Sequence, residues 1–456
     1  MKKRTHSRRK FISDTSKAGL ALSFAPSFLK GRSSLFNNKQ VRIGFIGVGL
    51  RGRNHLNNLL RNEDVECTAI CDIAEGAIEN SKKLFDKYNT KHPTVYTGST
   101  ESYREMLEKE DLDGVIISTN WRWHSPIALA AMEASVYTAV EVSGAFSVEE
   151  CWNWVETHER TGTHLFFLEN VCYRRDVMAV LGMTRAGLFG ELLHCRGGYQ
   201  HDLRHVKFDD GKGGLAFGED GIDEARWRTQ HSIDRDAELY PTHGLGPIMH
   251  QLDINRGNRM TSLSSFSTKA RSLGTYVQKH PDGGKDHPYS KINWSLGDIV
   301  TTQINTAKGE TIMLTHDTNS PRPYSLGFRT QGTEGLIEFD YHDQRIYVEG
   351  KMDSHRWEEA KVWLEKYDHP LWKKYAETAI GGGHGGMDYF LDRQFVADVM
   401  RGAPATIDVY DAVAMKVITP LSEQSISEGG SLQHIPDFTS GKWMTSQPSF
   451  AMSKDF

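Results

Sequence analysis

Residues 41–72 constrain the fold of this chain more than any other stretch. An apolar run of β character leads into a turn in which Gly47, Gly49 and Gly52 stand in G-x-G-x-x-G spacing, and a helical segment and a second apolar run follow. In such a unit the first glycine allows a tight turn, the second lets a pyrophosphate approach the backbone, and the third lets the helix lie close to the strand. The phosphates would then meet free N–H groups at the start of the helix. The alternative is a purely structural βα turn.

Asp72 follows the second apolar run, about 20 residues after Gly52, where a carboxylate accepts hydrogen bonds from the ribose hydroxyls of adenosine. Because it would repel a 2′-phosphate, the sequence favours NAD(H) over NADP(H). Arg51 and Arg53 could offset that repulsion.

Composition and charge exclude several classes of protein. The 456 residues suggest two or three domains of ordinary globular composition. The formal net charge is −5 and no basic stripe with interleaved aromatic residues is visible, so we expect no nucleic-acid partner. After the N-terminal segment, no apolar stretch of the sequence is long enough to span a bilayer. The five cysteines form no C-x-x-C pair, and we interpret them as buried thiols.

The first 35 residues have the pattern of an export signal. Residues 7–12, SRRKFI, are a twin-arginine signature, and the apolar stretch at 18–28 is too short for an ordinary transmembrane helix. No clean A-x-A cleavage triplet is present, and no cysteine follows that would indicate a lipoprotein. The alternative is a basic tail. We therefore expect export by the twin-arginine translocon, as a folded protein, to the periplasm or beyond, with no stable membrane insertion.

Three further apolar runs, at residues 113–118, 137–142 and 164–169, predict strands of the same sheet. Ligands of open parallel sheets bind outside the carboxyl ends of the strands. Residues expected to face the cofactor there are Trp121, Arg122, Trp123 and His124, in a loop, and Glu141, Val142 and Asn170. For the two Trp side chains, packing beneath a loop is the alternative.

The periodicity changes after Asn170. An amphipathic helix at residues 174–188 precedes seven β runs, which predict a mostly antiparallel sheet. These runs are 192–199, 263–269, 298–306, 310–317, 324–330, 336–341 and 345–348. Residues 200–259 form a long insertion rich in His, Asp and Gly, and insertions of that length are usually functional. A helical segment at 387–400 is expected to return toward the first domain.

The sequence thus predicts an α/β protein with two domains. Residues 40–170 would form a Rossmann dinucleotide-binding domain. Residues 171–456 would form a substrate-binding α+β domain with a large, open, mostly antiparallel sheet.

The GVGLRG turn, Asp72 and the E-V-S strand end at residues 141–143 resemble the glucose-fructose oxidoreductase and inositol dehydrogenase superfamily. That superfamily usually has Glu-Lys-Pro at this strand end, with the lysine at the reacting carbon, but Val142 stands in the lysine's place here. Its Asp-His pair would require an Asp four residues before His250, where Gly246 stands. Ordinary dehydrogenase chemistry is therefore not expected.

Longer motifs carry a closer resemblance. They are ENVCYRRD (169–176), GGYQHDLR (197–204), ARWRT (225–229), LYPTHG (239–244), DINRGNR (253–259), GDIVTTQI (297–304) and GHGGMDYFL (383–391). Together they resemble glycoside hydrolase family 109, NAD-dependent glycosidases known as α-N-acetylgalactosaminidases, over residues 41–443. The resemblance implies cofactor contacts at Leu50, Arg51, Asp72, Trp121 to His124, Glu141, Val142 and Asn170. It implies contacts with a terminal N-acetylgalactosaminide at Tyr199, Arg228, Tyr240, Pro241, Thr242, His243 and Tyr324.

A redox-neutral cycle fits an exported enzyme. Without an NAD pool, a net dehydrogenase would stop after one turnover. If NAD+ accepts hydride from the sugar C3, the ketone acidifies the C2 proton, a base removes it, and the glycosidic oxygen leaves from C1. Water then adds and the hydride returns to C3, which resembles what is proposed for the family and requires no flanking pair of carboxylates.

His243 is the first candidate for acid/base work, because an unperturbed imidazole titrates near neutral pH. Tyr173 and Tyr199 could donate phenol hydrogens to sugar oxygens, and Arg228 could stabilise an enolate or bind the N-acetyl carbonyl. His384 could cap the site from a glycine-rich loop or belong to a helix lead-in. Each of the others could also be a hydrogen-bonded residue without a chemical role.

Two other kinds of function remain open. One is a sugar oxidoreductase with tightly bound NAD(P), and the other is a sugar-binding protein with structural NAD, which the valine at position 142 favours. His201, Asp202, His205, His243 and His250 crowd one region, but no H-E-x-x-H or comparable spacing exists, so we expect no metal site. By analogy with the superfamily, an exposed face of the second sheet could support a homo-oligomer.

Overall fold

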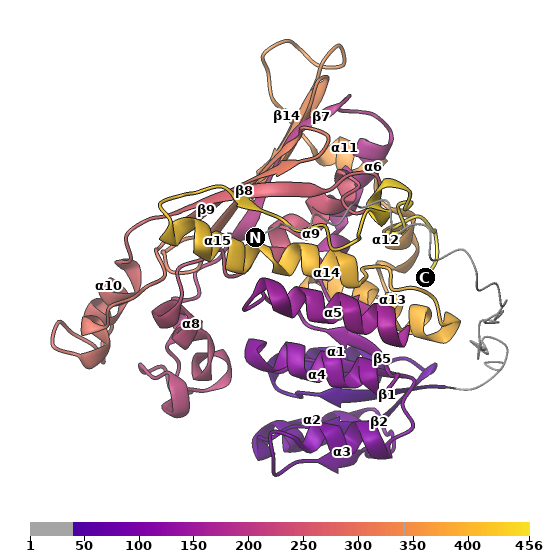
Figure 1. The fold of residues 1–456 in the computed structure, drawn as a ribbon, viewed down its shortest axis with the longest axis vertical. Coiled ribbons are helices and arrows are strands. Elements are labelled where there is room, and N and C mark those ends of the chain that lie inside the picture. Colours follow the sequence, from indigo (N-terminus) through magenta and orange to yellow (C-terminus); the bar gives the residue numbers. More distant parts are fainter. Residues whose placement is uncertain (1–39, 341–342) are drawn as a thin grey trace, which may run out of the picture.

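Two sheets organise the protein (Figure 1). The computed structural model describes residues 40–340 and 343–456, so the expected signal at residues 1–35 lies outside the described residues. Strands and helices of the first domain occupy the lower half of Figure 1, in indigo and purple, and the second sheet lies above them. A Rossmann-like domain followed by a second, sheet-based domain is the architecture that the sequence predicts.

The first sheet is parallel throughout, in the order β3-β2-β1-β4-β5-β6. Its strands are β1 (Val41–Ile46), β2 (Val65–Cys71), β3 (Thr94–Tyr96), β4 (Gly114–Ile117), β5 (Tyr137–Val140) and β6 (Leu165–Phe167). Its helices are α1 (Leu50–Leu59), α2 (Glu75–Lys87), α3 (Ser102–Lys109), α4 (Trp121–Glu133) and α5 (Val148–Thr161). Residues of β4, β5 and β6 are buried throughout, as in a parallel sheet covered on both faces. The strand order reverses between β1 and β4, where ligands of such sheets bind.

The prediction of a loop over residues 121–124 is wrong. These residues form the first turn of α4, in which Trp121 and His124 begin a buried stripe that continues through Ile127 and Ala131. That spacing is the spacing of one helix face. Polar residues and a proline between the buried positions concealed it. Because side chains on a helix point in different directions, residues 121–124 cannot all face one ligand.

The second sheet has the order β14-β13-β12-β11-β7-β10-β9-β8-β15. Its strands are β7 (Leu192–Gln200), β8 (Met260–Ser267), β9 (Val300–Thr306), β10 (Thr311–Asp317), β11 (Phe328–Gly332), β12 (Gly335–Phe339), β13 (Gln344–Val348), β14 (Glu358–Glu359) and β15 (Gln433–His434). Each of the seven predicted β runs overlaps one of these strands. Neighbouring strands are antiparallel except β7 and β10, which confirms a mostly antiparallel sheet.

The long insertion after β7 folds into short helices. They are α7 (Arg204–Lys207), η2 (Gly218–Asp220), η3 (Asp223–Arg226), α8 (Arg228–Asp234) and α9 (Thr242–Gln251). Helix α9 packs on β7, on α6 (Arg175–Arg185) and on η1 (Asn170–Tyr173). A Cβ on Gly244 would lie 2.2 Å from the backbone N of Gly198, so glycine at this position lets α9 reach the sheet.

The C-terminal helices join the two domains. They are α13 (Met387–Arg401), α14 (Val409–Lys416) and α15 (Ile418–Ser427), and the sequence indicated only the first. Helix α13 packs on α1 and β1, α14 on α5 and β6, and α15 on β8. In Figure 1 the yellow helices α14 and α15 lie between the first domain and the second sheet. The expected return of residues 387–400 to the first domain is confirmed.

The remaining helices are α10 (Ser272–Lys279), η4 (Pro288–Lys291), α11 (Lys361–Lys366), α12 (Pro370–Tyr375), η5 (His384–Gly386) and η6 (Lys442–Met444). All five cysteines are buried with free thiols, as interpreted from the sequence. In residues 40–340 and 343–456, no helix combines the length and apolar character needed to cross a bilayer.

Candidate functional site

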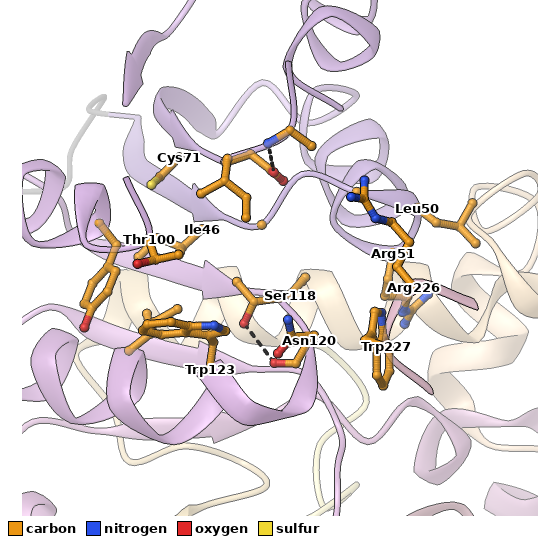
Figure 2. A pocket seen from close by; sticks show the side chains of 18 of the residues that line it. Ile46, Leu50, Arg51, Cys71, Thr100, Ser118, Asn120, Trp123, Arg226 and Trp227 are labelled. Atoms are coloured by element: carbon orange, nitrogen blue, oxygen red, sulfur yellow. Dashed lines mark hydrogen bonds between the residues drawn. The ribbon is translucent and has the colours of Figure 1, made fainter. Parts of the chain in front are cut away.

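A cavity of about 470 Å³ opens at the carboxyl edge of the parallel sheet, beside the point where the strand order reverses (Figure 2). Gly47, Gly49, Leu50, Arg51 and Asp72 line it, all of which the sequence assigned to the cofactor. Trp123, Ser118, Thr119 and Asn120 contribute from the other side of the cavity. We refer to this space as the dinucleotide cleft.

The glycine turn fits an anionic group. Gly47 has φ +86°, and a Cβ there would lie 2.7 Å from the carbonyl carbon of Ser118. A Cβ on Gly52 would lie 2.0 Å from the Gly47 oxygen, whereas one on Gly49 would meet nothing within 4 Å. Helix α1 begins directly after Gly49 without a side-chain cap or an acidic residue in its first turn. Its first N–H groups therefore face the cleft as donors for a diphosphate.

Asp72 is held at the end of β2 by two backbone donors. Its Oδ2 accepts a hydrogen bond from the Val48 N–H and its Oδ1 from the Ala74 N–H, both at 2.8 Å. Each carboxylate oxygen has a second lone pair, which can accept a ribose hydroxyl. The residues present fit a nicotinamide dinucleotide with an unphosphorylated adenosine ribose.

Residues of the insertion also line the dinucleotide cleft. Asp223, Glu224, Arg226 and Trp227, from η3 and the residue after it, line the cleft together with the glycine turn. Figure 2 shows Arg226 and Trp227 beside Arg51 at one end of it. The sequence pointed to the insertion but to none of these four residues.

A second cavity, of about 150 Å³, adjoins the dinucleotide cleft. The two share Arg51, Ser118, Thr119, Glu224 and Trp227. The second cavity is also lined by Trp121, His124, Glu141, Val142, Asn170, Tyr199, Arg228, Tyr240, His243 and His384. The structure therefore brings predicted cofactor residues and predicted sugar residues together around two adjoining cavities.

His243 is oriented by a buried carboxylate. Its Nδ1 lies 2.8 Å from Glu169 Oε1 and 3.0 Å from Oε2, and the Glu169 side chain is fully buried. An ionised carboxylate can only accept, so Nδ1 carries a proton and Nε2 is the nitrogen left for the cavity. Sequence reasoning placed Glu169 at a strand end and missed this role. Its position beside Asn170, at the exit of β6, was the available signal.

Two phenols lie beside this imidazole, of which Tyr240 is buried and Tyr199 partly buried. The Tyr199 ring centroid is 5.2 Å and the Tyr240 centroid 4.8 Å from that of His243. Burial raises the pKa of both tyrosines above the usual value, so both remain neutral phenols that can donate a hydrogen bond. The Tyr199 hydroxyl lies 3.3 Å from His201 Nδ1.

Arg228 supplies a positive charge on the same side. Its guanidinium stacks over the rings of Trp121, at 4.9 Å, and Tyr240, at 5.5 Å. Its Nε lies 2.5 Å from the Glu224 carboxylate. Burial disfavours the charge, but Glu224, Tyr199 and Tyr240 together outweigh burial and hold the pKa of Arg228 above its usual value. The cation therefore persists in a largely dry setting, where its hydrogen bonds to an anion are strong.

Arg51 connects α1 to both domains. Its Nε donates to Glu141 at 2.6 Å, and its Nη1 donates to Asp388 of α13, also at 2.6 Å. Asp388 additionally accepts from Asn170 Nδ2 at 2.6 Å and lies 2.7 Å from His384 Nδ1. Three predicted site residues, Arg51, Asn170 and His384, thus converge on Asp388, which the sequence did not identify.

His55 lies buried behind this group. Its Nε2 is 2.7 Å from Glu141 and its Nδ1 is 2.6 Å from Asp392 of α13. Burial disfavours the imidazolium, but Asp392 and Glu141 outweigh burial and raise the pKa of His55 to about 9. The Glu141 carboxyl remains ionised because Arg51 and His55 lower its pKa against the effect of burial.

Several predicted residues lie outside the two cavities. Tyr173 is buried, with its ring 5.0 Å from Phe450, and lines neither cavity, so its predicted catalytic role has no geometric support. The Arg122 side chain is exposed and lies 3.6 Å from Asp234. Tyr324 stands behind Tyr199, with ring centroids 6.4 Å apart.

Pro241 and Thr242 are buried at the start of α9 and line neither cavity. His250 stacks on Phe450, at 4.1 Å between ring centroids, away from His243. Within residues 40–340 and 343–456, no group of three or more His, Cys, Asp or Glu side chains is arranged to hold a metal ion.

Comparison with known proteins agrees with this arrangement. Residues 173–445 match a family model described as "Glycosyl hydrolase 109, C-terminal domain", and residues 41–168 match "Oxidoreductase family, NAD-binding Rossmann fold". A "Glycosyl hydrolase family 109 protein" from Parabacteroides distasonis is 46% identical over 468 residues, covering 98% of this chain and 100% of the relative. An "Alpha-N-acetylgalactosaminidase" from Tannerella forsythia is 50% identical over 420 residues, covering 90% of this chain and 89% of the relative.

Solved structures share the fold. A levoglucosan dehydrogenase in complex with NADH and L-sorbose has a TM-score of 0.61 at 18% identity, covering 88% of this chain and all of that chain. An inositol dehydrogenase homologue from Azotobacter vinelandii, in complex with NADH and myo-inositol, has a TM-score of 0.60 at 16% identity, covering 87% and 98%. At these identities the likeness concerns the fold alone.

Proposed function

The chain belongs to glycosyl hydrolase family 109 and is a glycoside hydrolase, and we propose that it removes terminal α-linked N-acetylgalactosamine residues with the aid of NAD. The substrate follows from the name of the Tannerella forsythia relative. The cofactor is a nicotinamide dinucleotide, and Asp72 supports NAD over NADP because its carboxylate would face the 2′-position.

Bound NAD+ would supply a hydride acceptor for the sugar C3–H and give the same hydride back before the product leaves. The chain's own residues hold it in place. The glycine turn and the start of α1 receive the diphosphate, and Asp72 receives the ribose. Trp227 and Arg226 line the cleft from the second domain.

The second cavity is where we place the sugar. His243 accepts and returns a proton at Nε2, since Nδ1–H is held by Glu169. Tyr199 and Tyr240 donate to sugar oxygens, and Arg228 binds the N-acetyl carbonyl or the negative charge that develops when the C2 proton leaves. The side chain of Val142, at the cavity wall, has no group that can donate or accept a proton. An imidazole must therefore carry out the proton transfer that a lysine there would perform.

One observation carries this proposal. A cavity with an imidazole oriented by a buried carboxylate shares five wall residues with a cleft built for a dinucleotide. A hydrolase without redox chemistry would not need a dinucleotide cleft beside its sugar cavity. A net dehydrogenase would not explain why the chain belongs to a family of glycosyl hydrolases.

The test is to incubate the purified protein with aryl α- and β-glycosides, without added cofactor, in D2O. We expect release of the aryl group from the α-N-acetylgalactosaminide and deuterium at C2 of the product. Hydrolysis without label at C2 would overturn the elimination route. A keto product with accumulating bound NADH would instead indicate a sugar oxidoreductase, the second candidate, which the match of residues 41–168 to an NAD-binding oxidoreductase family supports.

We further propose export through the twin-arginine route, on the basis of SRRKFI at residues 7–12. This route carries folded proteins, so the cofactor would be bound before export. The double variant Arg8→Lys/Arg9→Lys should leave the protein in the cytoplasm of the producing cell. Export of this variant at the normal level would contradict the proposal.

A further inference from the structure

Lys416 is a fully buried cation beside the second cavity. It ends α14, and its Nζ lies 2.9 Å from Ser143 Oγ, 3.4 Å from the Gly144 oxygen and 3.3 Å from Glu150 Oε1. Ser143 directly follows Val142, a residue of the cavity wall. Neither the sequence patterns nor the mechanism above uses this ammonium.

The end of α14 is fixed closely against this stretch. The Ala145 N–H donates to the Lys416 carbonyl at 3.0 Å. A Cβ on Gly144 would lie 2.0 Å from Thr419 Oγ1, so any larger residue at position 144 would push the two segments apart. The backbone segments that carry Lys416 and Ser143 are therefore held next to each other.

Ser143 passes the effect of this ammonium to His124. The His124 Nε2 lies 3.0 Å from the Thr119 carbonyl oxygen, which can only accept, so Nε2 carries the proton. In the neutral ring Nδ1 is then an acceptor, and Ser143 Oγ stands 3.2 Å from it. Because the ammonium of Lys416 can only donate, Ser143 Oγ accepts from Lys416 and its own hydrogen is directed to His124.

We propose that Lys416 is a positioning residue: through Ser143 it fixes the neutral, Nε2-protonated form of His124, which in turn holds the Thr119 carbonyl at the junction of the two cavities. Thr119 lines both cavities, and His124 lines the second. The inference concerns the same site as the proposed function and rests on it for the identity of the ligands.

The charges around His124 agree with this role. Burial and the Lys416 ammonium lower the pKa of His124 to about 4, against the opposing effects of the hydrogen bond to the Thr119 carbonyl and of the Glu141 carboxylate. Glu150 of α5 faces the far side of Lys416, and Arg51 and His55 neutralise Glu141. A protonated Nδ1 would have to donate to Ser143, and the serine hydrogen would then lose its acceptor.

The test uses Lys416→Met, Ser143→Ala and the double variant, each prepared with bound dinucleotide. The first readout is the titration of His124 by NMR of 13C-labelled histidine, with the resonance identified in His124→Gln. Both single variants remove support for the neutral ring, so we expect the pKa of His124 to rise by about one unit or more in each. Lys416 and Ser143 act in one relay, so removing either should have the same effect. We expect each single variant to lose about tenfold in affinity for the dinucleotide, and the double variant to lose no more than the single variant that binds it less tightly.

Lys207→Met is the matched control, because among residues 40–340 and 343–456 Lys207 is the other buried lysine, and it donates to Thr318 and Asn319 instead. His124 should titrate there as in the unaltered protein. An unchanged pKa of His124 in either folded single variant overturns the inference, as do additive losses of affinity. The titration needs no glycoside, so failure of the proposed hydrolysis and failure of this inference are distinguishable.

Discussion

The Nδ1 of His243 lies 2.8 Å from the Oε1 of Glu169, and the two residues come from different elements, α9 and the exit of β6. Glu169 has a further partner in the Val171 N–H, at 2.9 Å, which holds the carboxylate in one orientation. The pair therefore points one imidazole nitrogen at the cavity and fixes the proton on the other. This is the arrangement that a general acid or base requires.

The first prediction concerns this pair. His243→Ala should lower turnover at least about 10²-fold with the dinucleotide still bound. Glu169→Gln keeps the size of the side chain but allows the imidazole to change tautomer, so turnover should fall as well, by about tenfold or more. Initial rates and the bound dinucleotide are measured together. His205→Ala, at an exposed histidine of the insertion, is the control and should retain its turnover. Undiminished activity of His243→Ala would remove this residue from the mechanism.

The second prediction separates two glycines of the same turn. In Gly52→Ala the new methyl group would lie 2.0 Å from the Gly47 oxygen, so we expect a loss of about 1–3 kcal/mol in the free energy of unfolding. In Gly49→Ala the methyl group meets no protein atom within 4 Å and φ is −65°, so stability should be retained while the dinucleotide binds more weakly. Urea unfolding and dinucleotide retention on gel filtration check both. Equal stability of the two variants would contradict the geometry of the turn.

The third prediction concerns selectivity between NAD and NADP. Asp72→Ser removes the carboxylate and with it the repulsion of a 2′-phosphate, so affinity for NAD+ should fall about tenfold while discrimination against NADP+ disappears. Calorimetry of protein stripped of dinucleotide measures both affinities. Glu75→Gln, an exposed acidic residue at the start of α2, should change neither. An Asp72→Ser protein that still rejects NADP+ would show that other residues set the selectivity.

Sequence periodicity located the strands because it reports burial, which is a local property. The glycine spacing and Asp72 likewise act within one short βαβ unit. Contacts between distant segments left no comparable pattern. Glu169 and His243 are 74 positions apart, and Arg51 and Asp388 are 337 apart. No local sequence pattern indicates that the members of either pair meet in the folded protein.

Tyr173 illustrates a different failure. It was predicted as a donor to sugar oxygens because it carries a phenol, and residue type alone does not report the direction of a side chain. The 3-10 turn η1 rotates its side chain into the core against Phe450, while Asn170 keeps its contact with Asp388. The direction of a side chain within a single turn depends on packing that comes from elsewhere in the molecule.

The fourth prediction is a pH dependence of stability. The pKa of His55 is raised to about 9 in the folded protein, from an ordinary value near 6.5 in the unfolded chain. Its contribution is therefore fully present below about pH 6.5 and is lost as the pH rises through about 9. The free energy of unfolding should fall by roughly 2–3 kcal/mol across that window. His55→Gln should be less stable at pH 6 and should lose less between pH 6.5 and 9. If the free energy of unfolding changed with pH in the same way in the unaltered protein and in His55→Gln, His55 would be excluded as the cause.

Helix α13 closes the nucleotide half of the molecule, with Asp392 on His55 and Asp388 on Arg51. The ribosome therefore makes the first strand of this half long before the helix that completes it. A nascent chain that ends before residue 387 has the glycine turn but lacks both carboxylates that anchor α1. Helix α1, whose first turn faces the dinucleotide cleft, therefore gains both of these anchors only when nearly the whole polypeptide has been synthesised.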